Sequence, residues 1–186
     1  VCLGMRAAFD AAGKSVPPLR YHLKNRIPYA RGLGSSSAAI VGGLVAGLVL
    51  AGHTLPAWGE EALLNMAAEI EGHPDNVAPA VYGGIQLGIH AEGRWMTERV
   101  NLPPGLQLVC FIPDAIGKTS TARAVLSDEI TRKDAVFNIG RVALLINALA
   151  SNNIDQLRHG CDDALHQVCA FRHAMPLLHT CLLLFL

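Results

Sequence analysis

Apolar residues recur along this chain in two patterns, one typical of helices and the other of strands. Helix-like spacing predicts helices over residues 1–13, 38–52, 55–72, 119–127, 133–151 and 153–168. Alternating or continuous apolar residues predict strands over residues 19–28, 83–90 and 106–114. Because the strands come early and the helices late, the pattern predicts an α+β fold, not a doubly wound alternation of strands and helices.

Residues 38–52 read AAIVGGLVAGLVLAG and are apolar throughout. The run is shorter than the roughly 20 residues that a membrane-spanning helix needs. Gly43 and Gly47 have the spacing at which two helices approach closely, in membranes and in soluble cores alike. We therefore predict a fully buried core helix here.

Composition and charge narrow the class of partner. The chain has 186 residues, of which 51% are hydrophobic, and its 15 basic residues balance 15 acidic ones. This balance favours neither nucleic acid nor an anionic membrane as a partner. The cysteines form no CxxC pair. Their pattern favours a reducing compartment, and we expect a cytoplasmic protein, or a plastid one if an import signal precedes this sequence.

The stretch NRIPYARGLGSSSAAIVGG, residues 25–43, combines an extended segment, a glycine-serine loop and the apolar helix. Such an arrangement is typical of phosphate binding, because glycines let backbone N–H groups approach an anion and the helix dipole favours negative charge. The hydroxyls of Ser35, Ser36 and Ser37 can cap the helix, donate to phosphate or ligate magnesium. The simpler alternative is a loop that only caps its helix.

Familiar nucleotide and hydrolase motifs do not account for the loop. The dinucleotide fingerprint GxGxxG fails because Ser37 stands where its last glycine belongs, and the elbow GxSxG fails at Ala38. The loop has no Walker lysine. A second Walker-like string, Gly117-Lys118-Thr119, fails because Ile112 occupies the place of the first glycine.

Three segments together resemble one enzyme family. Pro28, Gly32, Leu33, Gly34, Ser35, Ser36 and Ala38 match the second motif of the GHMP kinases, Pro-x3-Gly-Leu-Gly-Ser-Ser-x-Ala. EGHPDNVAPAVYGG, residues 71–84, resembles the signature of the homoserine kinase branch, and the pair Thr119 and Arg123 fits the Thr-x3-Arg segment of that branch. The resemblance runs from about residue 20 to about residue 165.

The resemblance implies a two-domain architecture. A ribosomal-protein-S5-like, ATP-binding N-terminal domain would occupy residues 1–103, and a ferredoxin-like C-terminal domain would occupy residues 104–186. NLPPG, residues 101–105, would connect them. Both domains would be incomplete, because the family's first segments and its late glycine-rich motif are absent from this chain.

The resemblance also implies a role for each motif residue. Pro28, Arg31, Gly32, Leu33, Gly34, Ser35, Ser36, Ser37 and Ala38 would hold ATP. Ser36 and a glutamate of the next helix would hold Mg²⁺. Glu69 and Glu71 are the candidates for that glutamate, and we favour Glu69 because it lies within the helix and not at its very end.

The amino-acid substrate would be bound by His73, Asp75, Asn76, Arg123 and Arg172, with Arg172 standing in for a displaced family arginine. Asn76, Thr119 and Arg123 would act in catalysis. Asn76 occupies the place where other branches carry a general base, and an amide cannot take a proton at neutral pH. Asp75 is the less favoured base. The simpler alternative for the HPDN string is a turn in which Asp75 or Asn76 caps a helix.

The activity that the resemblance implies is ATP-dependent phosphorylation of L-homoserine to O-phospho-L-homoserine, in threonine biosynthesis. The alternatives are another GHMP kinase, of the mevalonate type, and an inactive fragment of a homoserine kinase. We expect no nucleic-acid or membrane partner, and a homodimer when the protein is complete. Because two family motifs are absent, we expect the isolated chain not to catalyse the reaction.

Overall fold

The computed structural model describes residues 1–53, 59–110, 112 and 126–167. Contacts divide the chain into two units. The first unit contains Val1–Tyr29 and Leu33–Arg99, and the second contains Ala30–Gly32 and the chain from Val100 onward. The predicted domain boundary at residues 103 and 104 stays a prediction. Helices and a strand pair are both present, as the α+β assignment requires.

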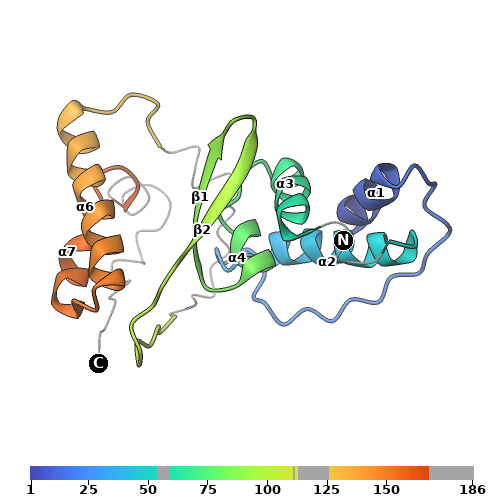
Figure 1. Cartoon of the computed structure of the whole chain (residues 1–186), viewed down its shortest axis with the longest axis horizontal. Helices are drawn as coiled ribbons and strands as arrows, with labels where there is room; N and C mark the ends of the chain where they lie inside the picture. The colour runs from blue at the N-terminus through green and yellow to red at the C-terminus, as the bar shows by residue number, and fades with distance from the viewer. Residues whose placement is uncertain (54–58, 111, 113–125, 168–186) are drawn as a thin grey trace. The chain divides into compact units, whose positions relative to one another are not determined.

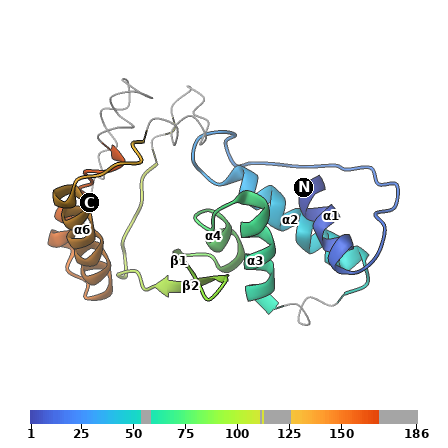
Figure 2. The ribbon, with the colours of Figure 1, turned by 90° about the horizontal axis from the view of Figure 1, so that it is seen from above.

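The helices of the first unit are α1 (Cys2–Ala11), α2 (Ser35–Leu50), α3 (Gly59–Glu71) and α4 (Val77–Tyr82). Figures 1 and 2 both show α1 beside α2. Glycines permit this approach: a Cβ on Gly47 would lie 2.6 Å from the Cβ of Ala8, and a Cβ on Gly43 would meet the backbone of Val1. The GxxxG spacing therefore marks the crossing of two helices within one unit.

The core of the first unit lies between α2, α3 and α4. Leu44, Leu48, Leu64, Ala67 and Val77 are almost fully buried in one cluster. The prediction of a fully buried α2 is wrong, because two residues near its end, Val49 and Leu50, are more than half exposed. Within the described residues, the structure has no helix of the length and apolarity that crossing a bilayer requires.

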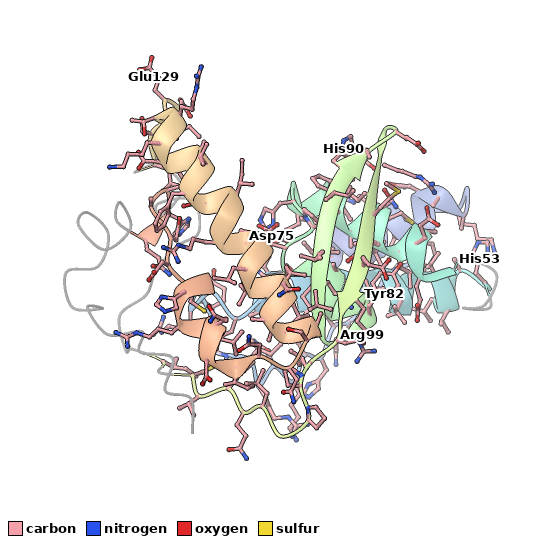
Figure 3. The ribbon with its side chains drawn as sticks, turned by 60° about the vertical axis from the view of Figure 1, so that its left-hand side comes forward. His53, Asp75, Tyr82, His90, Arg99 and Glu129 are labelled. Atoms are coloured by element: carbon pink, nitrogen blue, oxygen red, sulfur yellow. The ribbon has the colours of Figure 1, made fainter. Side chains whose placement is uncertain are left out.

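A two-stranded sheet follows α4. β1 (Ile85–Ala91) confirms the strand predicted at residues 83–90, and β2 (Arg94–Val100) is its partner. The two-residue turn between them has φ of +53° at Glu92 and +75° at Gly93, which suits the twist of a hairpin. Across the strands, the rings of His90 (labelled in Figure 3) and Trp95 meet edge to face at 4.8 Å.

Asn65 fastens α3 to this hairpin. Its Nδ2 donates to the carbonyl oxygen of Trp95 at 3.0 Å, and its Oδ1 accepts from the Trp95 N–H at 2.7 Å. The side-chain amide thus satisfies both backbone groups of one β2 residue. This pairing holds β2 against the helix layer.

Two predicted strands are corrected. Residues 19–28 are irregular, and Leu23 is 64% exposed. Residues 106–110 form no strand either, and Leu108 and Val109 are largely exposed; the rest of that prediction reaches residues outside those described. A strand needs a hydrogen-bonded neighbour, and among the described residues β1 pairs with β2 instead.

The second unit contains α6 (Arg132–Ala150), which confirms the helix predicted at residues 133–151. Its N-cap is Thr131, whose hydroxyl accepts from the Asp134 N–H at 3.1 Å. The single helix predicted at residues 153–168 is wrong over its described part, where η2 (Ile154–Gln156) and the one-turn α7 (Leu157–Gly160) occur instead. The helix predicted at residues 119–127 lies almost wholly outside the described residues.

The break after α7 has a chemical cause at Asp163. Its carboxylate accepts from the N–H groups of residues 165–167 and from Asn138 of α6 at 2.7 Å. These bonds start a new turn and leave no continuous helix. Burial alone would raise the pKa of the Asp163 carboxyl, but the hydrogen bonds outweigh it and the pKa is lowered.

Candidate active site

The glycine-serine loop leads directly into α2. The N-cap of α2 is Gly34, in the left-handed region at φ +74° and ψ +20°, and it has no side chain to cap the helix. The N–H groups at the start of a helix have no partner within the helix. A side-chain cap, the simpler alternative for this loop, is therefore not what the structure contains.

The three serines after Gly34 have three different environments. Ser35 Oγ accepts a hydrogen bond from Asn25 Nδ2 at 2.9 Å. Ser36 Oγ donates to Glu71 Oε2 at 3.2 Å. Ser37 is fully buried, and its hydroxyl oxygen has no hydrogen-bond partner among the described residues.

The contact of Ser36 distinguishes the two candidate glutamates. Glu71, the last residue of α3, is half-buried and receives the Ser36 hydroxyl, whereas Glu69 is exposed. Because helix residues advance by about 100° each, side chains two positions apart point in nearly opposite directions. Only one of these carboxylates can face the loop, and in this structure it is Glu71.

A signal in the sequence could have identified Glu71. The buried residues of α3 are Leu63, Leu64, Ala67 and Ala68. A face drawn through residues 64, 67 and 68 continues to residue 71, at the spacing of three and four. Glu71 therefore ends the buried face of α3.

The segment between α3 and α4 brings a histidine and an aspartate together. His73 Nδ1 lies 3.6 Å from Asp75 Oδ2, and the two side chains are 16% and 63% exposed. The His73 Nδ1 atom is buried and has no hydrogen-bond partner among the described residues. Asp75, labelled in Figure 3, thus reaches from the surface toward a buried imidazole nitrogen.

Asn76 joins this segment to the glycine-serine loop. It is the N-cap of α4, yet its side chain makes no capping hydrogen bond. The side chain lies against Gly34 instead: a Cβ on Gly34 would stand 3.3 Å from Asn76 Cβ and 3.5 Å from Asn76 Oδ1. Residues implied to bind nucleotide and residues implied to bind substrate are therefore neighbours within the first unit.

The other predicted site residues are placed as follows. Pro28 and Leu33 are exposed in the loop, and Ala38 is half-buried in α2. Arg31 and Gly32 group with the second unit. Thr119, Arg123 and Arg172 lie outside the described residues. Asn25, which donates to Ser35 Oγ, is not among the predicted site residues, because no helix or strand period marks a side-chain amide.

The site offers oxygen donors for a hard cation. The part of the chain that the structure describes holds no group of three or more His, Cys, Asp or Glu residues that could bind a metal ion. Magnesium commonly uses one or two protein oxygens and completes its shell with phosphate oxygens and water. Ser36 Oγ and Glu71 Oε2, 3.2 Å apart, suit that manner of binding.

Electrostatics near the end of α4 involve Tyr82, labelled in Figure 3. Burial, and then the carboxylates of Glu60 and Glu61, raise the pKa of the Tyr82 hydroxyl. This phenol therefore stays protonated at neutral pH and contributes no negative charge to the unit.

Comparison with known proteins gives the same assignment as the motifs. Residues 2–84 match the family described as GHMP kinases N terminal domain. Homoserine kinase of Desulfitobacterium hafniense is 44% identical over 86% of this chain and 52% of its own length. Homoserine kinase of Clostridium beijerinckii is 42% identical over 88% of the chain and 54% of its own length.

A solved structure shows the same likeness in three dimensions. The crystal structure of homoserine kinase from Cytophaga hutchinsonii superposes with a TM-score of 0.68 at 28% identity, over 78% of this chain and 47% of that one. The chain therefore belongs to the GHMP kinase superfamily. Within that superfamily, it falls in the homoserine kinase branch. It spans about half the length of the curated relatives that it matches.

Proposed function

We propose that the protein to which this chain belongs transfers the γ-phosphoryl group of ATP to the hydroxyl of L-homoserine, giving O-phospho-L-homoserine. The observation that carries the proposal is the hydrogen bond of Ser36 to Glu71 at the start of α2. It sets a carboxylate beside a loop suited to phosphate, and Asn76 reaches the same loop through Gly34.

The start of α2 would hold the phosphates of ATP. N–H groups without a helical partner point toward the loop, and the helix dipole favours negative charge there. Gly34 has no side chain to obstruct the anion and adopts its left-handed conformation without strain. Ser37 supports this role, because a fully buried hydroxyl without a partner among the described residues leaves hydrogen-bonding capacity for a ligand.

Ser36 and Glu71 would hold Mg²⁺, which neutralises phosphate charge in phosphoryl transfer. This assignment replaces Glu69 by Glu71, because Glu71 is the carboxylate that contacts Ser36. The hydrogen bond from the Ser36 hydroxyl keeps the Glu71 carboxylate near the loop. In phosphoryl transfer, the protein contributes mainly by positioning groups in this way and by stabilising charge.

His73 and Asn76 would bind L-homoserine next to the phosphates. In the reaction, the substrate hydroxyl oxygen bonds to the γ-phosphorus, the bond from that phosphorus to the β–γ bridging oxygen breaks to release ADP, and the hydroxyl proton passes to a base or to water. Asn76 cannot accept that proton. Asp75, 3.6 Å from His73 Nδ1, remains the less favoured candidate to accept it. Arg123, Thr119 and Arg172 remain proposed substrate residues, and a guanidinium suits the substrate carboxylate.

The experiment is an acceptor panel with the whole gene product that contains this chain and, beside it, the 186-residue chain. ADP release would be measured with L-homoserine, mevalonate and L-serine as acceptors. We expect activity with L-homoserine in the whole gene product, and its loss in Ser36→Ala but not in the matched variant Ser15→Ala, whose serine is exposed outside the site. Activity with mevalonate alone would contradict the proposal.

Two features of the whole protein stay predictions. These are its location in the cytoplasm and its homodimeric state. Sedimentation of the whole gene product measures the second, and a monomer at micromolar concentration would contradict it.

A further inference from the structure

Asn25 makes three hydrogen bonds at the start of α2. Its Oδ1 accepts from the Ile27 N–H at 3.0 Å, and its Nδ2 donates to the Ile27 carbonyl oxygen at 3.0 Å. The same Nδ2 donates to Ser35 Oγ at 2.9 Å. Bonds to a backbone two residues ahead form an Asx turn, which fixes the asparagine side chain. The fixed side chain then presents an N–H to the first residue of α2.

This N–H determines what the Ser35 hydroxyl can do. A serine hydroxyl has one proton to donate and two lone pairs to accept with. Because the Asn25 amide takes one lone pair, the Ser35 proton remains to be donated elsewhere. A hydroxyl that accepts one hydrogen bond also becomes a stronger donor in the next one.

The two neighbouring serines differ from Ser35 in their hydrogen bonds. Ser36 directs its proton to Glu71. Ser37 is fully buried, and its oxygen has no hydrogen-bond partner among the described residues. Of the two serines with a hydrogen bond at this turn, Ser35 is therefore the one that accepts and keeps its proton for a ligand.

We propose that Asn25 is a positioning residue for nucleotide binding: by donating to Ser35 Oγ, it turns the Ser35 hydroxyl into a hydrogen-bond donor for a phosphate oxygen of ATP. This inference rests on the proposed function and deepens it. Asn25 acts through Ser35 and itself touches no reacting atom.

Asn25→Asp is the informative variant. It has the same size, and its carboxylate still accepts from the Ile27 N–H, which keeps one of the two hydrogen bonds of the turn. The donor to Ser35 and to the Ile27 carbonyl oxygen is lost, and the new carboxylate accepts the Ser35 proton instead. The hydrogen bond is thereby reversed, and a negative charge stands at the start of α2, where the phosphates bind. A matched control is Asn101→Asp, which adds the same charge at an exposed site in the second unit.

The test is calorimetric titration of the whole gene product with ATP and Mg²⁺, with inorganic triphosphate and Mg²⁺, and with L-homoserine. We expect Asn25→Asp to weaken ATP and triphosphate binding by the same factor, tenfold or more, while L-homoserine binding and the melting temperature stay unchanged. If Asn25 served folding alone, Asn25→Asp would have a lower melting temperature and would bind all three ligands more weakly. That result would overturn the inference.

A double-mutant cycle completes the test. Asn25→Ala and Ser35→Ala should each weaken ATP binding, and the double variant should lose no more than the stronger single one, because both remove the same donor. Additive losses, or unaltered ATP affinity in Asn25→Asp, would overturn this inference and leave the proposed function in place. If the unaltered protein binds no ATP, the proposed function fails, and this inference fails with it.

Discussion

Gly34→Ala tests the contact between the glycine-serine loop and Asn76. Gly34 has φ +74°, and alanine in the left-handed region costs about 1–2 kcal/mol. The new Cβ would lie 3.3 Å from Asn76 Cβ, so the Asn76 side chain must shift by a few tenths of an ångström. We expect the shift to weaken one hydrogen bond of Asn76 to substrate, worth about 1 kcal/mol, or a roughly fivefold rise in KM for L-homoserine.

Two other glycines separate strain from displacement. Gly32 has φ +72° and Gly13 has φ +64°, and a Cβ at either position meets no atom within 4 Å. Gly32→Ala and Gly13→Ala should therefore lose similar free energy of unfolding but leave the KM for L-homoserine unchanged. Denaturant melts and initial rates of the three variants provide the assay. An equal rise in KM for Gly34→Ala and Gly32→Ala would refute the reasoning from Asn76.

Three further predictions concern the metal site, the second unit and the helix crossing. Glu71→Gln should lower the initial rate at least tenfold and raise the Mg²⁺ concentration that gives half of the maximal rate, while Glu69→Gln changes neither. If Glu69→Gln has these effects and Glu71→Gln does not, Glu69 is the ligand. Because the folded pKa of Asp163 is lowered, its carboxylate stabilises the fold above its unfolded pKa of about 3.9 and loses this effect as the pH falls through the folded value. Urea melts should show Asp163→Asn less stable at pH 6, by a difference that shrinks as the pH falls below about 3.9; a difference independent of pH would exclude this linkage. Gly47→Ala should lower the free energy of unfolding by about 1–3 kcal/mol, because its Cβ has no room against α1. Gly42→Ala, whose Cβ meets no atom within 4 Å, should raise it by up to about 1 kcal/mol. Thermal or denaturant melts measure both, and equal effects of the two variants would contradict the close helix crossing.

The local chemistry of the sequence predicted the start of the site well. The glycine-serine loop, the apolar residues after it and the Gly43–Gly47 spacing were enough to predict α2 and its close neighbour. The alternating residues of β1 were enough to predict that strand. In these segments the local pattern and the packing agree, which is the condition for reading structure from sequence.

Other elements depend on contacts that no local pattern carries. β2 reads RWMTERV, without regular alternation, and it is held by β1 and by the Asn65 amide. Residues 19–28 alternate but have no strand partner among the described residues. The choice of Glu71 depended on which face of α3 is buried. Asn25 contacts Ser35 through a turn and one side-chain hydrogen bond, so only the folded chain reveals that contact.

The proposed function depends on the claim that the start of α2 binds the phosphates of ATP. The most direct measurement is the shift of backbone amide NMR signals as ATP and Mg²⁺ are added to the whole gene product. We predict saturable shifts at Gly34, Ser35, Ser36 and Ser37, with the signal of Gly13, outside the site, unchanged. Saturable ATP binding that leaves the amides of residues 34–37 unshifted would contradict the claim.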